Sequence, residues 1–452
     1  MCRIIVHFTL LVVCIAACLI PARSQQPTVS ADSVKAEFLH AWNGYKRYAW
    51  GHDALKPLSK QPHDWYNNTS LYLTPVDAFD LMLLMGLSKD AAEAKQLILD
   101  SLSFDKDIEI QSFEITIRLL GGLLSAYQMD GDQRFLTLAE DLGKRILPIY
   151  NSPTGLPYRY VHLQSGKTRD SVNNPAEIGT ALLEFGTLSK LTGKSVYYDK
   201  AKNALVQLYK RRSKIGLVGE GIDVVTGKWI NPTSHIGGGI DSYYEYLLKA
   251  WLLFGDKDCK EMWDESIKAI DIYLADTVRG ALWYGQADME TGKRTGTSFG
   301  ALEAFLPAVL CLAGDTARAA RLEESCFKMW NLYGVEPEQI DYTTMAVTAK
   351  QYYLRPEIIE SAYYLYQYTN DPKYVRMGET FYRGLVAHCK TDAAYTYLKD
   401  VTTGEKADGM ESFFFAETLK YLYLLLAPKE TLQFDKIIFS TEAHPLRHTW
   451  KE

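Results

Sequence analysis

The sequence has few of the residues and patterns that mark zinc proteins, nucleic-acid-binding proteins or membrane-spanning proteins. Seven of its 452 residues are cysteine, none in a Cys-x-x-Cys pair, and the nine histidines are scattered without a His-Glu-x-x-His motif, so no zinc site is indicated. Lysine and arginine form no cluster and the net charge is −6, which argues against binding to nucleic acid or an anionic membrane. After residue 24 no segment is long and apolar enough to span a bilayer. We therefore expect a neutral substrate or partner and no membrane span.

The first 24 residues predict an export signal peptide. Arg3 precedes an apolar stretch at 10–17, and Ala22-Arg23-Ser24 fits a cleavage site. The segment ending at Cys18 also fits a bacterial lipoprotein signal, which would place a lipid anchor on that residue, and both interpretations stay open. We expect an exported protein, either periplasmic or secreted, or lumenal in a eukaryotic secretory pathway. Residues 25–452 are predicted to form a single domain and a monomer.

A helix-breaking glycine or asparagine recurs at a near-constant interval, which indicates an internal repeat. The breakers are Gly131, Gly193, Gly255, Gly314 and Asn370, separated by 62, 62, 59 and 56 residues. Each lies between an apolar and a charge-rich segment, so each repeat predicts an antiparallel helical hairpin with a left-handed C-cap at the breaker. A repeat that runs nearly from end to end favours one large domain.

The two helices of each repeat differ in composition. The first, for example 243–254 and 413–426, is apolar nearly all round and should be buried. The second, for example 318–328, alternates charged and apolar positions at helical spacing, as is typical of an outer layer. Inner helices are predicted to begin near Thr74, Ser112, Pro175, Asp241, Ser298, Pro356 and Glu411, and outer helices near Asp90, Asp132, Ser195, Lys257, Thr316 and Pro372.

A helix at 33–48 would complete a seventh pair. The count predicts an all-α fold, an (α/α)7 barrel of seven helical hairpins, because an open solenoid would need end caps that the sequence lacks. Short β-hairpins are predicted just before the inner helices, all at one end of the barrel. Their turns are Ser165-Gly166-Lys167, Thr226-Gly227-Lys228, Thr291-Gly292-Lys293 and Thr403-Gly404-Glu405.

Acidic residues recur near the starts of the inner helices. Helix N-termini favour carboxylates in any protein, but these acids lie on helices expected to be buried, where an unpaired charge is costly. Glu114 precedes Arg118 by four residues, which places both on one helix face. A lumen with several carboxylates fits glycoside hydrolysis by paired acids, binding of a hard cation, or both. The acids are Asp77, Glu114, Glu177, Asp241, Glu303, Glu357 and Glu411.

Five motifs, in order, closely resemble those of glycoside hydrolase family 47, the class I α-1,2-mannosidases. They occupy residues 112–127, 241–249, 354–357, 410–414 and 440–445, and the last contains Thr441-Glu442-Ala443-His444-Pro445. With His52-Asp53 and Lys56-Pro57, the resemblance covers about residues 35–446. It implies an (α/α)7 barrel that hydrolyses terminal α-1,2-linked mannose with inversion and binds Ca²⁺ at its floor.

The resemblance also implies roles for individual residues. Glu114 matches the general acid, Glu357 the base that activates water, and Asp241 a third catalytic carboxylate, with the division of acid and base roles left open. Thr441 matches the direct protein ligand of calcium, through its hydroxyl and carbonyl oxygens. Residues that match the binding of the terminal mannose or of calcium-bound waters are Arg118, Glu177, Arg355, Glu360, Glu411 and Glu442.

Three positions depart from the family pattern. Gly239 stands where enzymes that trim a single glycan branch carry arginine, so single-branch selectivity is not expected. Ala301 replaces a histidine, and Ala304 replaces a disulfide cysteine whose partner position is kept as Cys326. Cys311 would lie about 10 Å further along the hairpin than position 304, so we predict no disulfide in the mature chain.

These observations favour a calcium-dependent inverting exo-α-1,2-mannosidase acting on a mannose-containing oligosaccharide. A second hypothesis is a non-catalytic or weakly catalytic protein of the same fold that recognises mannose-rich glycans. The presence of Glu114, Asp241, Glu357 and Thr441 together favours catalysis. Another α/α-barrel glycosidase or lyase would leave the Thr-Glu-Ala-His-Pro run without a role.

Overall fold

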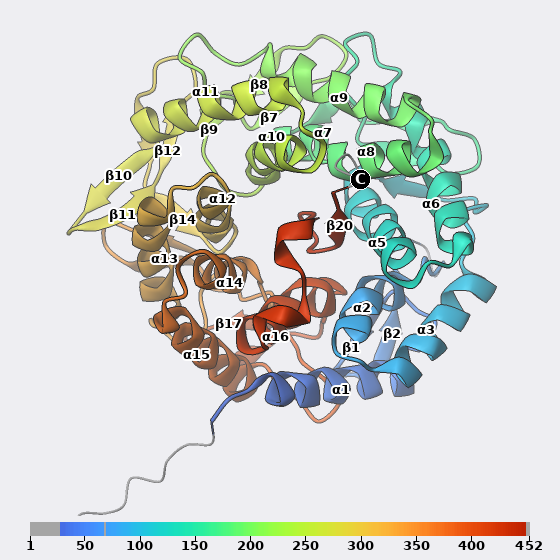
Figure 1. Ribbon diagram of the computed structural model, residues 1–452. Helices are drawn as coiled ribbons and strands as arrows, with labels where there is room; N and C mark the ends of the chain where they lie inside the picture. The colour runs from blue at the N-terminus through green and yellow to red at the C-terminus, as the bar shows by residue number, and fades with distance from the viewer. Residues whose placement is uncertain (1–27, 67–68, 449–452) are drawn as a thin grey trace, which may run out of the picture.

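The computed structural model describes residues 28–66 and 69–448, so the predicted signal peptide lies outside the described residues. The helices form two concentric rings around a central axis (Figure 1). The inner ring consists of α2 (Leu73–Leu84), α5 (Gly121–Asp130), α8 (Leu182–Thr192), α10 (Asp241–Phe254), α12 (Leu306–Leu312), α14 (Glu357–Thr369) and α16 (Leu419–Leu426). The outer ring consists of α1 (Ala31–Tyr48), α3 (Ser88–Ser101), α6 (Gln133–Ile146), α9 (Val196–Tyr209), α11 (Lys257–Tyr273), α13 (Thr316–Trp330) and α15 (Pro372–His388).

The ring closes where the N-terminal helix α1 packs against the last inner helix, α16. This arrangement confirms the predicted (α/α)7 barrel, including the use of the N-terminal helix as the seventh outer helix. The apolar inner helices are buried nearly all round; in α10 the side chains of Tyr243, Leu247 and Leu253 have no exposed surface.

Four of the five predicted breakers end the inner helices directly, whereas Gly314, with a φ of 87°, lies one residue beyond the right-handed C-cap of α12, Ala313. Gly131, Gly193, Gly255 and Asn370 are left-handed C-caps, with φ between 57° and 86°. In each case the cap N–H donates to the carbonyl oxygen four residues earlier, as from Gly131 to Tyr127 at 2.9 Å. A left-handed residue costs glycine little, so these positions set the length of each inner helix.

Short segments lead into four of the inner helices. These are α4 (Ser112–Ile115) and the π-helix η1 (Thr116–Leu120) before α5, α7 (Pro175–Gly179) before α8, the 3-10 helix η3 (Leu302–Phe305) before α12, and the π-helix η4 (Phe414–Thr418) before α16. Further 3-10 turns are η2 (Leu147–Tyr150), η5 (Lys429–Thr431) and η6 (Phe434–Lys436). π-Helical turns are rare and occur often at functional sites, and here η1 contains Arg118 and η4 contains Glu417.

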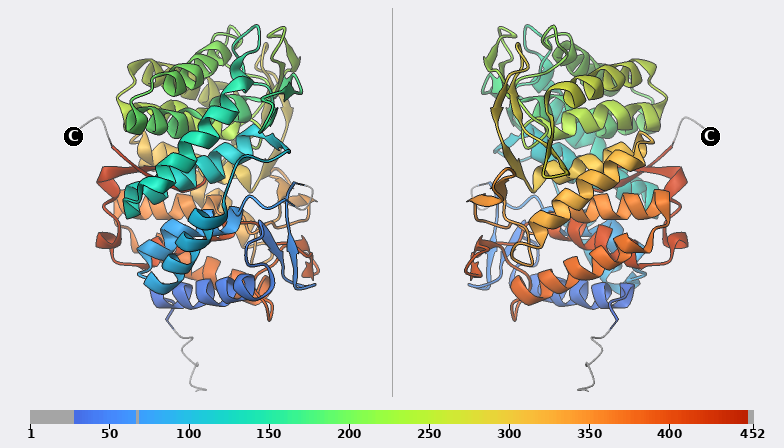
Figure 2. Two further views of the ribbon diagram at one scale, coloured as in Figure 1. Left: turned by 90° about the vertical axis from the view of Figure 1, so that its right-hand side faces the viewer. Right: turned by 90° about the vertical axis from the view of Figure 1, so that its left-hand side faces the viewer.

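Small antiparallel sheets lie at one end of the barrel, and the C-terminal hairpin lies at the other (Figure 2). All four predicted β-turns join paired strands. Three-stranded sheets are β3 (Glu109–Gln111), β4 (Tyr160–His162) and β5 (Thr168–Arg169); β6 (Val172–Asn173), β7 (Gly221–Asp223) and β8 (Trp229–Asn231); β9 (Thr233–Ser234), β12 (Gln286–Asp288) and β13 (Arg294–Gly296); and β14 (Ser298–Gly300), β15 (Gln339–Asp341) and β16 (Ala346–Ala349). Two-stranded sheets are β1 (Ala54–Lys56) with β2 (Gln61–His63), β10 (Ala275–Val278) with β11 (Ala281–Tyr284), β17 (Leu398–Asp400) with β18 (Glu405–Lys406), and β19 (Ile437–Phe439) with β20 (Pro445–Arg447).

One predicted helix start is wrong. Ser298 belongs to β14, where it is paired with Asp341 of β15, and the helical segment begins at Leu302. The pairing partner lies more than forty residues away in the sequence, so a tertiary contact determines the local structure.

The C-terminal hairpin β19–β20 lies at the centre of the ring (Figure 1), where β20 packs against α5 and β19 against α10. It closes the end of the barrel opposite the sheets. Across the described ranges, no helix is both long and apolar enough to cross a membrane. Cys259, Cys311, Cys326 and Cys389 are buried and unpaired, so none of these four forms a disulfide.

Candidate active site

A cavity of about 460 Å³ occupies the middle of the barrel. Its walls come from the N-terminal ends of inner helices and the segments that precede them, so its mouth faces the end that carries the sheets. The cavity is rich in carboxyl groups, and three phenylalanines supply apolar faces against which a sugar ring can pack. The acids are Glu114, Glu177, Asp241, Glu245, Glu357, Glu360, Glu417 and Glu442, and the aromatic residues are Phe113, Phe305 and Phe413.

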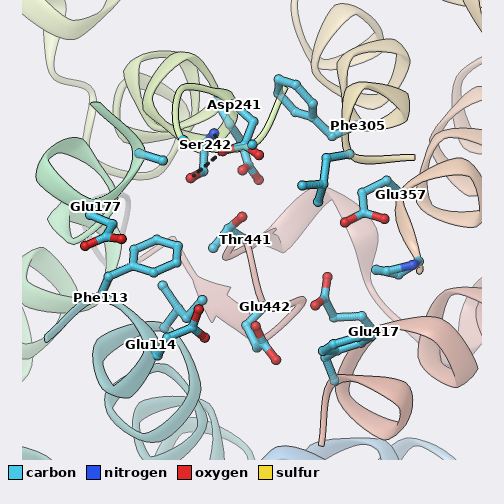
Figure 3. A pocket seen from close by; sticks show the side chains of 18 of the residues that line it. Phe113, Glu114, Glu177, Asp241, Ser242, Phe305, Glu357, Glu417, Thr441 and Glu442 are labelled. Atoms are coloured by element: carbon cyan, nitrogen blue, oxygen red, sulfur yellow. Dashed lines mark hydrogen bonds between the residues drawn. The ribbon is translucent and has the colours of Figure 1, made fainter. Parts of the chain in front are cut away.

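The three residues predicted as catalytic come from different walls of this cavity (Figure 3). Glu114 lies on α4, and Asp241 and Glu357 are the first residues of α10 and α14. Figure 3 shows them on three sides of the space, with Thr441 between them. Acids far apart in the sequence therefore meet at one site, as the barrel arrangement predicted.

The surroundings of these three carboxyl groups differ. Glu114 Oε2 accepts hydrogen bonds from Arg118 Nε (3.1 Å) and Nη2 (3.0 Å). Burial raises the pKa of Asp241 to about 7, although the backbone N–H of Ser242 donates to its Oδ1 at 2.7 Å. Burial raises the pKa of Glu357 to about 8 against the opposing charge of Arg355, and its Oε2 has no hydrogen-bond partner. Without a ligand, Asp241 and Glu357 therefore titrate close to neutral pH.

Among the predicted substrate-binding residues, Glu177, Arg355 and Glu360 line the cavity and are held by neighbours. Glu177 accepts from Arg159 (2.8 and 3.0 Å) and Gln111 (3.0 Å). Arg355 donates to both oxygens of Glu338 (2.7 and 3.3 Å). Glu360 accepts from Tyr421 Oη at 3.0 Å and lies 3.9 Å from Lys249 Nζ, and burial raises its pKa to about 7.

Glu411 is not among the residues that line the cavity. It accepts a hydrogen bond from Trp65 Nε1 at 3.2 Å, and the Trp65 ring lies 5.3 Å from the guanidinium of Arg118. Glu411 is therefore linked to the cavity indirectly, because Trp65 packs against Arg118, which lines the cavity. Since Arg118 also packs 5.6 Å from the Phe413 ring, its guanidinium is enclosed by two aromatic residues.

Sequence reasoning missed Glu245 and Glu417 as cavity residues. Glu245 follows Asp241 by four residues, so helical spacing from a recognised acid was a usable signal. Glu417 lies within the π-helix η4, whose wider turn is not marked by any simple spacing.

Thr441 lies at the floor, in the loop between β19 and β20. Its backbone N–H donates to Tyr246 Oη at 3.2 Å, and Tyr246 in turn donates to Glu184 at 2.6 Å. Neither the hydroxyl nor the carbonyl oxygen of Thr441 takes part in a hydrogen bond with the described part of the chain. Both oxygens that the resemblance names as calcium ligands are therefore free to bind a cation.

A buried network of alternating charges fixes this loop, and we call it the floor network: Arg118, Glu442, Asp77, His444, Asp80 and Lys420. Arg118 pairs with Glu442 and lies 3.7 Å from Asp77 Oδ2. His444 lies between Asp77 (3.3 Å) and Asp80 (2.8 Å), and hydrogen bonds to these acids raise its pKa to about 9 although burial opposes this. Lys420 donates to the Ala443 carbonyl and pairs with Asp80, both at 2.7 Å.

Within residues 28–66 and 69–448, no three His, Cys, Asp or Glu side chains are grouped so that they could hold a metal ion together. The candidate metal site at Thr441 would instead use the two neutral oxygens of this residue as direct ligands, with the carboxyl groups of the cavity around them. Calcium accepts hydroxyl, carbonyl and water oxygens, so the donor set at the floor fits this ion.

Carboxyl groups that face one another across the space for a sugar are typical of glycoside hydrolases. Comparison of the sequence supports this class, because residues 37–448 match glycosyl hydrolase family 47. The chain belongs to that family.

Several known proteins are similar along nearly the whole chain. Alpha-mannosidase I MNS5 of Arabidopsis thaliana is 38% identical, over 93% of this chain and 78% of the relative. The human ER degradation-enhancing alpha-mannosidase-like protein 2 is 36% identical, over the same shares of the two chains. The structure of an alpha-1,2-mannosidase from Trichoderma reesei superposes with a TM-score of 0.85 at 29% identity, covering 92% of this chain and 98% of that one.

Proposed function

We propose that this protein is a calcium-dependent, inverting exo-α-1,2-mannosidase that removes terminal α-1,2-linked mannose from mannose-rich glycans. The observation that carries the proposal is the meeting of Glu114, Asp241 and Glu357 around one cavity with Thr441 at its base. The likeness to the Trichoderma reesei alpha-1,2-mannosidase supports the linkage. We further propose that the chain acts as an exported monomer, directed by its first 24 residues.

In this proposal Glu357 is the base. It accepts a proton from water as the water oxygen attacks the anomeric carbon, and the bond to the leaving-group oxygen breaks on the opposite face of the sugar. Inversion requires about 6.5–9.5 Å between base and acid to admit this water. A buried carboxylate with a raised pKa is a strong base once ionised, and the neighbouring Arg355 favours the ionised form.

A second carboxyl group protonates the leaving oxygen. The family resemblance assigns this role to Glu114, whose Oε2 accepts two hydrogen bonds from Arg118. Burial raises the pKa of Asp241 to about 7, so Asp241 is the competing candidate. Arg118, Glu177, Arg355, Glu360, Glu411 and Glu442 would position the terminal mannose or the waters around the ion.

Thr441 would hold Ca²⁺ through its hydroxyl and carbonyl oxygens. When bound, the ion supplies a positive charge that can coordinate sugar hydroxyls at the floor of the cavity. The floor network keeps the Thr441 loop in place for this purpose.

The central test is hydrolysis of α-1,2-mannobiose followed by NMR. We expect the β-anomer of mannose to be released first, loss of activity in EDTA and its recovery with Ca²⁺. Glu357→Gln should lower kcat by about 10²–10⁴-fold, the usual contribution of a general base. Release of the α-anomer first would exclude inversion, and full activity in EDTA would exclude the role of calcium.

The acid is identified with an aryl α-mannoside whose leaving group needs no protonation. The variant of the true acid, Glu114→Gln or Asp241→Asn, should lose activity on mannobiose but keep most of it on the aryl substrate. If both variants lose activity equally on the two substrates, neither residue is the proton donor.

A second candidate function is recognition of mannose-rich glycans without efficient hydrolysis. The similarity to the human ER degradation-enhancing alpha-mannosidase-like protein 2 favours it. Calorimetric binding of a high-mannose glycan by the wild type, with no mannose released, would support recognition over catalysis.

A further inference from the structure

Glu303 is a buried acid that the proposed mechanism does not use. It lies on η3, and only 7% of its surface is exposed. Its carboxyl group is held in place, because the backbone N–H of Gly300 donates to its Oε2 at 3.0 Å. Acidic side chains are rarely buried without a partner or a function, so a role for Glu303 is expected.

The carboxyl group of Glu303 packs directly on Gly237, in the turn that precedes α10. A Cβ atom at position 237 would lie 2.5 Å from Glu303 Oε1, 2.6 Å from its Cδ and 3.0 Å from its Oε2. Non-bonded atoms normally stay about 3.5–4.0 Å apart, so no side chain fits there. Gly237 does not have a positive φ. The contact with Glu303, and not the backbone conformation, therefore requires glycine at this position.

The same turn holds the start of α10, where Asp241 is the first residue. The carbonyl oxygen of Gly237 accepts hydrogen bonds from the backbone N–H groups of Ile240 and Asp241, both at 3.0 Å. The N–H of Gly237 donates to His235 Nδ1 at 3.2 Å. Gly237 thus connects the carboxyl group of Glu303 to the backbone of Asp241, although η3 and α10 are far apart in the sequence.

Charged groups also face Asp241 from more than one element. Burial is the main cause of its raised pKa, about 7; the negative charges of Glu245 on α10 and Glu303 on η3 act in the same direction, and His235 acts against them. Acids on other walls of the same cavity include Glu177 on α7 and Glu357 on α14. Glu303 is therefore a charge outside α10 that acts on Asp241.

The surroundings of Glu303 include both signs of charge. Burial raises the pKa of Glu303, and the nearby Glu338 raises it further. His235 and the N–H of Gly300 lower it, because both favour the carboxylate form. Glu303 thus has partners that stabilise its negative charge.

We propose that Glu303 is a positioning residue for Asp241. Its carboxyl group holds the turn that begins α10, and its negative charge favours the protonated form of the Asp241 side chain. The proposal rests on the proposed glycosidase function only for the use of that proton, which Asp241 would donate to the leaving-group oxygen.

The direct test is the titration of Asp241, followed by ¹³C NMR of protein labelled at the aspartate carboxyl carbons. The resonance of Asp241 is the one missing from Asp241→Asn. Glu303→Gln keeps the shape of the side chain and an oxygen that can accept from Gly300, and it removes the charge. We expect the apparent pKa of Asp241 to fall by about 0.5–1 pH unit, because a nearby like charge disfavours ionisation. An unchanged titration would overturn the proposal.

The matched control is Glu290→Gln, which removes a negative charge from the exposed turn between β12 and β13. It should leave the titration of Asp241 unchanged. A shift as large as that in Glu303→Gln would show that net charge, and not the position of Glu303, is the cause, and would overturn the proposal.

The contact with Gly237 gives a second test. Gly237→Ala places a Cβ atom against the carboxyl group of Glu303 and should lower kcat on α-1,2-mannobiose about tenfold or more. Glu303→Ala removes the clashing atoms, so the double variant should be no less active than Glu303→Ala alone. Losses that multiply would mean that the two residues act independently, which contradicts the proposal. Circular-dichroism melting checks that the variants are folded.

The pH profile of kcat separates this proposal from the proposed function. If Asp241 is the proton donor, the basic limb in Glu303→Gln should move to lower pH by the same amount as the titration, with KM unchanged within about twofold. A shifted titration with an unmoved limb would support the positioning role of Glu303 and give the role of acid to Glu114. If the wild type hydrolyses no substrate, the NMR titration still decides the proposal.

Discussion

Two buried groups of acids in this barrel are stabilised in opposite ways. In the floor network, Asp77, Asp80 and Glu442 each contact a cationic side chain. Between α13 and α14, Glu323 and Glu336 are also completely buried, but none of their four carboxyl oxygens has a hydrogen-bond partner. We call this second pair the wall acids.

The pKa shifts of Asp80 in the floor network and of the wall acids have opposite signs. Burial alone would raise the pKa of Asp80, but Lys420 and His444 lower it below its ordinary value. Burial raises the pKa of Glu323 and Glu336 well above 4.5, and the negative charges of Glu357 and Glu338 raise that of Glu336 further. Its cationic neighbours therefore favour the ionised form of Asp80, whereas burial favours the protonated form of the wall acids.

Buried carboxyl groups therefore have two different roles in this barrel. The floor network joins α2, η1, α16 and the C-terminal loop, and so determines the position of Thr441. The carboxyl oxygens of the wall acids form no hydrogen bonds with other elements. Ionisation of these acids would therefore make the stability of the barrel wall near Glu357 depend on pH.

The largest expected effect comes from breaking the floor network. Lys420→Met removes a buried cation that contacts Asp80 and the Ala443 carbonyl, and loss of one partner of a buried pair costs about 3–5 kcal/mol. Urea unfolding measures this loss. The matched control is Lys399→Met, which breaks an exposed pair with Glu405 and should leave the unfolding free energy unchanged. Equal stability of the two variants would show that the floor network contributes no stability.

A smaller effect is expected when the floor binds its proposed ion. A ligand at a hundred times its Kd stabilises a protein by about 2.7 kcal/mol, so Ca²⁺ should raise the melting temperature and EDTA should reverse the shift. Thr441→Val should abolish the shift, because it removes one of the two ligand oxygens. Thr348→Val, at an exposed position, serves as the control. A full calcium shift in Thr441→Val would place the ion elsewhere.

The parts of the barrel that sequence predicted well depend on local signals. The breakers at Gly131, Gly193 and Gly255 end helices through backbone conformation alone, so the hairpins follow from spacing. The Glu114–Arg118 pair likewise follows from the i,i+4 geometry of one turn.

The missed features depend on contacts between distant segments. Ser298 is in a strand because Asp341 pairs with it. Glu336 lies in the loop after α13, and nothing near it in the sequence distinguishes it from a surface acid. It is nevertheless completely buried, and the charge of Glu357 raises its pKa.

The wall acids give the smallest of these effects and the clearest dependence on pH. Their folded-state pKa values are raised above the unfolded value, so the stability they contribute is fully present below about pH 4.5 and is lost as pH rises toward the folded-state value. Glu323→Gln and Glu336→Gln cannot ionise. At pH 8 each variant should therefore exceed the wild type in stability by about 1–3 kcal/mol, because raising the folded-state pKa by one unit corresponds to about 1.4 kcal/mol, and at pH 4 the difference should vanish. Thermal melting across this pH range measures both limits; an advantage that is the same at pH 4 and pH 8 would mean that ionisation of the wall acids has no part in it.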